Sequence, residues 1–227
     1  MTRLLALASL ALITACSGGT ETATGQGQAI KEAIKAGNFG KRNKQPAPLP
    51  VLTRDLLNSI TISSLETTVE TTNTTAFMIP IAARTNSGNG KIVVWKTVGT
   101  ENIILRDGVL VGTKGLGNDL GSTDARVTVR GLQTRSTKTG EKTLYIRRDD
   151  NTIEPIRLQC EITNVGPESV VIVERSYATT HMREVCSNAT GRVVNDFWVE
   201  GRDGTVRKSR QWGGPRLGYL SFRLLKK

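Results

Sequence analysis

The chain has 227 residues, of which 31 are Lys or Arg and 20 are Asp or Glu, so its formal net charge is +11. This length suits one domain, or two small ones, with a hydrophobic core of its own. Aromatic residues make up only 4% of the chain, and threonine, valine, isoleucine and glycine are common, which favours strands over helices. The single histidine and the lack of a Cys-x-x-Cys spacing argue against a zinc site.

The first 15 residues have the layout of a secretory signal peptide. Arg3 is followed by an apolar run from Leu4 to Ile13, which is shorter than the roughly 20 residues that a membrane-spanning helix needs. Small residues then lead to Cys16, and Ile-Thr-Ala-Cys resembles the bacterial lipobox, in which cleavage precedes a cysteine that receives acyl chains such as palmitate. We therefore expect residues 1–15 to be removed and Cys16 to be lipidated. The alternative is an ordinary signal peptide followed by a chance cysteine.

Residues 16–50 are expected to carry the lipid and to tether the folded body to the membrane. Residues 17–28 are rich in serine, glycine, threonine, alanine and glutamine, a composition typical of a flexible linker. Ser17 follows the cysteine, and in enteric-type sorting a serine there, rather than an aspartate, indicates the outer membrane. Residues 29–36 favour a short helix, and a proline-rich segment follows. No second long apolar stretch occurs, so we expect a soluble body facing the periplasm.

The folded body is expected over residues 51–227 as a single β-rich domain. Residues 53–60 predict a short helix with Thr53 or a neighbour as its cap. Its core-facing residues are expected to be Leu56, Leu57 and Ile60. From residue 61 onward the hydrophobic pattern alternates with period two, which is typical of strands. The strands expected from it are 66–72, 75–84, 90–97, 101–106, 109–113, 125–131, 142–149, 152–158, 168–177, 193–200, 204–210 and 217–225. In two of them the core-facing positions are expected to be Val171, Val173, Leu220, Phe222 and Leu224.

Asp-Gly pairs mark the clearest turns between these strands. Asp107-Gly108 suits the left-handed backbone of a tight hairpin, and Asp203-Gly204 repeats the signal. Asp149-Asp150-Asn151 and Thr139-Gly140 predict two further turns. Closely spaced strands joined by tight turns predict an all-β fold, mainly an antiparallel sandwich or barrel-like sheet, with one or two short N-terminal helices.

Two cysteines remain once Cys16 is assigned to the lipid. Cys160 and Cys186 are an even pair in an exported chain, which predicts one disulfide. Closing a loop of that size would stabilise the fold by about 3–4 kcal/mol. Free thiols or metal ligands are the alternative, which the single histidine disfavours.

Three stretches carry a resemblance to a known family. They are Ile104 to Leu120, then Ser209-Arg210-Gln211-Trp212-Gly213-Gly214-Pro215 with Gly218-Tyr219-Leu220, and the lipobox with its tether and the Leu52 to Ile60 helix. Together they resemble the YjbF/GfcB lipoproteins, which are associated with exopolysaccharide and group 4 capsule operons. The chain departs from that pattern at Arg207 and Lys208, where the family often has an aromatic residue. The resemblance implies a mainly β lipoprotein that works beside an outer-membrane β-barrel protein and periplasmic polysaccharide-export proteins.

Asp119, Arg210 and Trp212 are candidate contacts for a glycan or a partner. Asp119 lies in a glycine-rich turn whose N–H groups could approach a ligand, although a structural turn capped by Asp119 is favoured and no phosphate-loop pattern is present. Trp212 precedes Gly213-Gly214 and could stack on a sugar, but a core anchor at a strand end is favoured. Arg210 belongs to a basic stretch suited to an acidic polysaccharide or anionic lipid head groups, although a solubilising surface is the simpler interpretation.

Catalysis finds little support in the sequence. His181 has no evident nucleophile beside it and is expected at the surface or in a turn. A carboxylate pair such as Asp119 and Asp124 could hydrolyse a glycoside, but a chain with 20 acidic residues offers many such pairs. We therefore expect a non-enzymatic lipoprotein of the outer membrane, without metal, cofactor or nucleic acid, that assists exopolysaccharide or capsule production or export. A polysaccharide-modifying enzyme and a general envelope module are the alternatives.

Overall fold

The structure, a computed structural model, describes residues 51–86 and 90–227. The expected signal peptide, the lipid site at Cys16, the tether and the helix expected at 29–36 lie outside these residues. The strands are β1 (Ser64–Val69), β2 (Thr74–Asn86), β3 (Gly90–Lys96), β4 (Asn102–Arg106), β5 (Val109–Lys114), β6 (Leu120–Thr123), β7 (Lys138–Arg147), β8 (Ile153–Ile172), β9 (Arg175–Asn188), β10 (Gly191–Glu200), β11 (Val206–Trp212) and β12 (Tyr219–Lys226). The helical segments are α2 (Arg54–Ser59), the 3₁₀ turn η1 (Glu70–Thr72) and α3 (Arg126–Thr134). In this part of the chain, no helix is long and apolar enough to cross a membrane.

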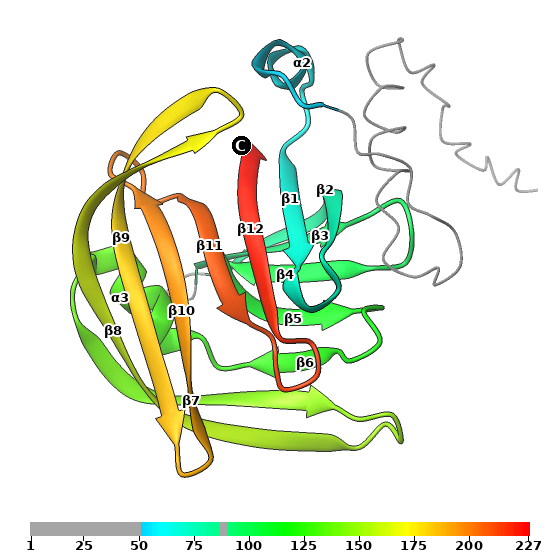
Figure 1. The fold of residues 1–227 in the computed structure, drawn as a ribbon, viewed down its shortest axis with the longest axis vertical. Coiled ribbons are helices and arrows are strands. Elements are labelled where there is room, and N and C mark those ends of the chain that lie inside the picture. The colour runs from blue at the N-terminus through cyan, green and yellow to red at the C-terminus, as the bar shows by residue number, and fades with distance from the viewer. Residues whose placement is uncertain (1–50, 87–89) are drawn as a thin grey trace, which may run out of the picture.

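The strands form one antiparallel sheet that curls into a nearly closed barrel (Figure 1). Its order is β5-β4-β3-β2-β1-β12-β11-β10-β9-β8-β7-β6, so the chain runs in two meanders that join where β1 pairs with β12. The two end strands approach each other, since a Cβ on Gly112 would lie 3.5 Å from the carbonyl oxygens of Leu120 and Gly121. Closure shields strand edges that would otherwise invite pairing with another chain. The predicted all-β, barrel-like fold is confirmed.

The barrel interior is filled by one side-chain face of most strands. Alternation places Leu65, Thr67 and Val69 of β1 inside, as the period-two pattern requires. The predicted core positions Leu220 and Phe222 are buried in this interior, and Leu224 packs half-buried against it. The buried apolar residues of this interior are Leu65, Val69, Met78, Trp95, Ile103, Leu105, Leu110, Leu120, Leu144, Ile146, Leu158, Cys160, Cys186, Leu217, Leu220 and Phe222.

Helix α3 replaces the strand predicted at 125–131, which was wrong. Val127 and Val129 alternate as a strand would, but Ala125, Val129 and Leu132 recur at helical spacing and are buried against residues of β8, β9 and β10. Two glycines let the helix approach the sheet closely. A Cβ on Gly131 would lie 2.3 Å from Ile162 Cγ2, and one on Gly140 would lie 2.6 Å from Val127 Cγ2. The turn predicted at Thr139-Gly140 was therefore wrong as well, because Gly140 is a contact point inside β7.

A second hydrophobic cluster lies under α2 and the tip of the long β8–β9 hairpin. Leu57 and Ile60 pack there with Phe77, Tyr177 and Leu225, and Leu56 is only half-buried. Of the possible caps, Thr53 is the one used, since Leu56 N donates to Thr53 Oγ1 at 3.2 Å. Arg54 Nε donates to the Val173 carbonyl at 3.0 Å, and Lys226 Nζ donates to the Leu57 carbonyl at 3.0 Å. Side-chain hydrogen bonds therefore hold α2 to the rest of the fold at both of its ends.

The β8–β9 hairpin differs most from its sequence prediction. The strand predicted at 168–177 contains the hairpin turn, in which Val173 and Glu174 have left-handed φ of 44° and 64°. Neither residue is a glycine, so the usual signal for such a turn was missing. Val171 is 66% exposed whereas Ile172 is buried, so the predicted inward direction of Val171 was wrong.

The turns at Asp107-Gly108 and at 149–151 formed as predicted. Asp107 and Gly108 have φ of 45° and 84°, which fits a two-residue hairpin between β4 and β5. Asp203-Gly204 also lies between paired strands, but within a longer connection of residues 201–205.

Candidate functional site

Asp119 caps the turn between β5 and β6. Its carboxylate accepts hydrogen bonds from Gly115 N at 2.8 Å, Leu116 N at 3.1 Å and Thr113 Oγ1 at 2.9 Å. These donors occupy both carboxylate oxygens. The geometry therefore favours the structural interpretation of this glycine-rich turn over a ligand-binding one.

Arg210 is bound to groups of the protein itself. Its guanidinium makes a two-pronged ion pair with Glu70, at 2.9 Å from Nε to Oε1 and 2.7 Å from Nη2 to Oε2, and lies 3.6 Å from the centroid of the Tyr219 ring. The hydrogen bond from Arg210 lowers the pKa of Glu70 below its ordinary value despite partial burial. Trp212, on the same strand, packs half-buried against the barrel core, which fits the anchor interpretation. The structure places Asp119 in a separate turn.

Gln211 is a residue whose role the sequence did not reveal. Strand β5 ends the sheet, so part of its backbone lacks a neighbouring strand. The Gln211 side chain fills that need, because its Oε1 accepts from Leu110 N at 2.8 Å and its Nε2 donates to the Gly108 carbonyl at 2.8 Å. Two of the stretches that carry the family resemblance therefore meet inside the barrel. The available signal was a polar side chain at an inward-facing position of β11.

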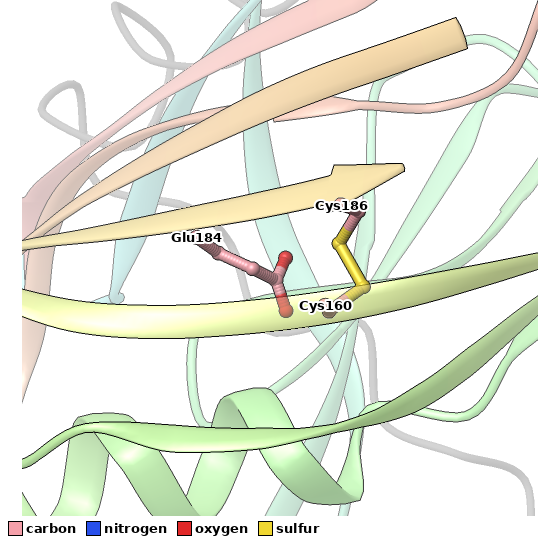
Figure 2. Close-up of side chains that lie close together, drawn as sticks. All are labelled: Cys160, Glu184 and Cys186. Carbon is pink, nitrogen blue, oxygen red and sulfur yellow. A yellow bond between two sulfur atoms is a disulfide. The ribbon is translucent and has the colours of Figure 1, made fainter. Parts of the chain in front are cut away.

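A buried polar centre lies beside the predicted disulfide. Cys160 and Cys186 are directly opposite one another on β8 and β9 and are joined as expected (Figure 2). The fully buried Glu184 carboxylate lies next to them and receives Lys142 Nζ at 2.9 Å and Asn195 Nδ2 at 2.7 Å. The Thr128 hydroxyl of α3 donates to its other oxygen.

This centre is electrostatically compensated. Burial raises the pKa of Glu184, but the Lys142 ammonium and the hydrogen bonds from Thr128, Lys142 and Asn195 lower it further, so the pKa lies below the ordinary value. Cys160, Glu184 and Cys186 lie close enough to share a metal ion, but sulfurs bonded to each other offer no thiolate ligand. The arrangement ties β7, β9, β10 and α3 together.

His181 is buried in β9, so the expectation of a surface or turn residue was wrong. Its Nε2 lies 2.8 Å from Asp196 Oδ1, and its Nδ1 lies 3.1 Å from Glu168 Oε2. The ring stacks on Trp198 at a centroid distance of 4.8 Å. Both ring nitrogens thus face carboxylates, and the histidine acts as a cross-link between β8, β9 and β10.

The other suggested catalytic pair is likewise committed to structural contacts. Asp124 pairs with Arg126, at 2.6 Å from Oδ2 to Nη2, which lowers the pKa of Asp124, while Asp119 holds its turn.

Basic residues on the outward face of β9, β11 and β12 are mostly paired with carboxylates. Arg183, Arg207, Arg210 and Arg223 make ion pairs with Asp196, Glu200, Glu70 and Glu66, respectively. The basic stretch at 207–210 is therefore largely neutralised. This stretch therefore contributes little to the net positive charge.

A cleft of about 790 Å³ opens between the strand pairs β2–β3 and β11–β12. The β4–β5 turn, the end of α3 and the β10–β11 connection border it. Its floor, called the apolar floor below, consists of Leu65, Val93, Trp95, Leu105, Phe222 and Leu224. Six cations line it, and the four that do not belong to β11 are called the basic rim: Lys91, Arg135, Arg202 and Lys227. These residues are distant in sequence, so no motif signalled the cleft.

Comparisons with known proteins identify the family. A family model described as group 4 capsule polysaccharide lipoprotein GfcB, YjbF matches residues 28–225. The fold is similar to the crystal structure of the hypothetical lipoprotein YmcC from Escherichia coli K12, with a TM-score of 0.69 and 14% identity over 91% of this chain and 98% of that one. A Bacteroides fragilis protein with a YmcC-like fold matches with a TM-score of 0.31 and 10% identity, over 72% of this chain and 93% of that one. No curated protein matches. The chain belongs to the YjbF family of group 4 capsule polysaccharide lipoproteins.

Proposed function

We propose that this protein is a non-enzymatic lipoprotein, held in the outer membrane by an acylated Cys16 and facing the periplasm, that assists the production or export of exopolysaccharide or capsule. It would act through protein partners, including an outer-membrane β-barrel protein and periplasmic export proteins, or through the glycan. The family match over residues 28–225 carries this proposal. The lipobox-like sequence before Cys16 supports the anchor.

The contacts of the acidic and histidine side chains support a role without catalysis. Four residues with side chains suited to acid–base chemistry are His181, Glu184, Asp119 and Asp124. Each holds hydrogen bonds or ion pairs within the fold. A general acid or base needs to reach the reacting group of a substrate.

Deletion of the gene tests the role in polysaccharide production. In a strain that makes the surface polymer, we expect deletion to lower the amount of polymer on the cells, and the wild-type gene to restore it. An unchanged amount of polymer would contradict the proposal.

Incubation of the purified protein with the native polymer tests the enzymatic alternative. We expect the length and composition of the polymer to stay unchanged. Shortening or modification that is lost in Asp119→Asn, but not in the matched surface variant Asp150→Asn, would instead support an enzyme.

A further inference from the structure

We propose that the cleft between β2–β3 and β11–β12 binds a single-chain anionic amphiphile, with an acyl chain on the apolar floor and a carboxylate or phosphate head at the basic rim. Part of its lining, namely Leu105, Asp107, Gly108 and Ser209, lies in the stretches that carry the family resemblance. The proposal does not depend on the role in polysaccharide production.

The apolar floor suits a hydrocarbon chain better than a sugar. Val93 and Leu224 are only half-buried, and they lie beside Trp95 and Phe222 of the barrel core. The polar side chains nearby are largely engaged, because Ser209 accepts a hydrogen bond from Gln211 and Gln133 donates to Asp107. A glycan would leave its hydroxyl groups without partners on such a surface, which is costly.

The basic rim supplies the complementary charge for an anionic head. Lys91 and Arg202 are exposed and have no carboxylate partner within residues 51–86 and 90–227. The cleft is lined by six cations and only two acidic residues, Asp107 and Asp203, and Asp203 is paired with Lys227 at 2.5 Å. The potential at the mouth is therefore positive, and it attracts anions.

The size of the cleft fits one chain. Its volume of about 790 Å³ falls in the range of roughly 300–1,000 Å³ that is typical of ligand sites. Each methylene moved from water onto the floor is expected to tighten binding about fourfold. Affinity should therefore rise with chain length until the floor is covered.

Quenching of tryptophan fluorescence by bromine-labelled palmitate tests the proposal. The protein would be the full chain with Cys16→Ser, purified without detergent. Trp95 lines the cleft, whereas Trp198 does not line it and stacks on His181. We expect quenching in a variant that keeps only Trp95, with Trp198→Phe and Trp212→Phe, and little quenching in Trp95→Phe. Absence of quenching in the first, or full quenching in the second, would overturn the proposal.

Charge reversal tests the rim. Lys91→Glu with Arg202→Glu should raise the Kd for palmitate about tenfold or more, because losing a hydrogen bond to a charged group weakens binding by at least that factor. It should leave binding of the corresponding uncharged, bromine-labelled alcohol nearly unchanged. Arg192→Glu, an exposed cation at the start of β10, is the matched control and should have little effect. An unchanged Kd for palmitate in the folded double variant would overturn the proposal. If that variant does not fold, Lys91→Gln serves in its place.

Competition with an acidic oligosaccharide tests whether the cleft binds a glycan instead of a lipid. We expect oligogalacturonate at millimolar concentration to leave the palmitate signal of Trp95 unchanged. Displacement of palmitate by the oligosaccharide would assign the cleft to a glycan and overturn the lipid proposal.

Discussion

Removal of the Lys142 ammonium provides a sharp test of the buried polar centre. Lys142→Met keeps most of the side-chain volume but leaves the fully buried Glu184 carboxylate without its cation, which is 2.9 Å away. Breaking a buried ion pair from one side costs about 3–5 kcal/mol. We expect a loss of that size in the free energy of unfolding at pH 7, measured by denaturant titration.

The stability of the wild type and that of Lys142→Met should depend on pH in opposite directions. In the wild type the pKa of Glu184 is lowered, so its contribution is present above the unfolded pKa of about 4.3 and is lost as the pH falls through the folded value. Without Lys142 burial dominates, and the pKa of Glu184 should be raised instead. The carboxyl is then neutral in the folded variant at low pH, and stability is lost as the pH rises. The difference in the free energy of unfolding between the wild type and Lys142→Met should narrow to about 1–2 kcal/mol near pH 4.

The matched control is Arg148→Met, which breaks an exposed ion pair with Glu154 at 2.6 Å. It should cost no more than about 1 kcal/mol. A loss below about 1 kcal/mol for Lys142→Met at pH 7, or a loss that does not shrink on acidification, would refute the electrostatic account of this centre.

Three further changes test the packing of α3, the disulfide, and the hydrogen bonds of Gln211 to the backbone of the sheet's end strand. Gly131→Ala should destabilise the protein by about 1–3 kcal/mol despite alanine's better helix propensity, because its Cβ would lie 2.3 Å from Ile162 Cγ2; Gly191→Ala, with open space around it, should be close to neutral in the same thermal melt. Replacing Cys160 and Cys186 together by alanine should cost about 3–4 kcal/mol in denaturant unfolding, and added reductant should then make no further difference. Gln211→Leu should cost about 1–3 kcal/mol, since Leu110 N and the Gly108 carbonyl lose their partner; hydrogen exchange at Leu110 that is no faster than in the wild type would argue against this role.

The sheet was predictable because alternation is a local signal. Residues such as Leu220 and Phe222 sit two apart on one face, and Asp107-Gly108 specifies its hairpin through left-handed backbone alone. The disulfide followed from the number of cysteines. None of these features requires knowledge of distant contacts.

The remaining features depend on what the chain packs against. Val127 and Val129 suit a strand, and they become helical because α3 has a pocket for Val129 and Leu132 among residues of β8, β9 and β10. His181 is polar yet buried, because Asp196 and Glu168 meet it from the neighbouring strands. The cleft combines Lys91, Arg202 and Lys227 from three elements that only the closed sheet brings together.

The amount of surface polysaccharide on cells whose only copy of the gene carries Cys16→Ala tests the central claim most directly. The anchored, non-enzymatic account predicts that the polymer falls to the level of the deletion strain, although the variant folds, forms its disulfide and accumulates in the periplasm. Wild-type amounts of polymer on those cells would contradict it.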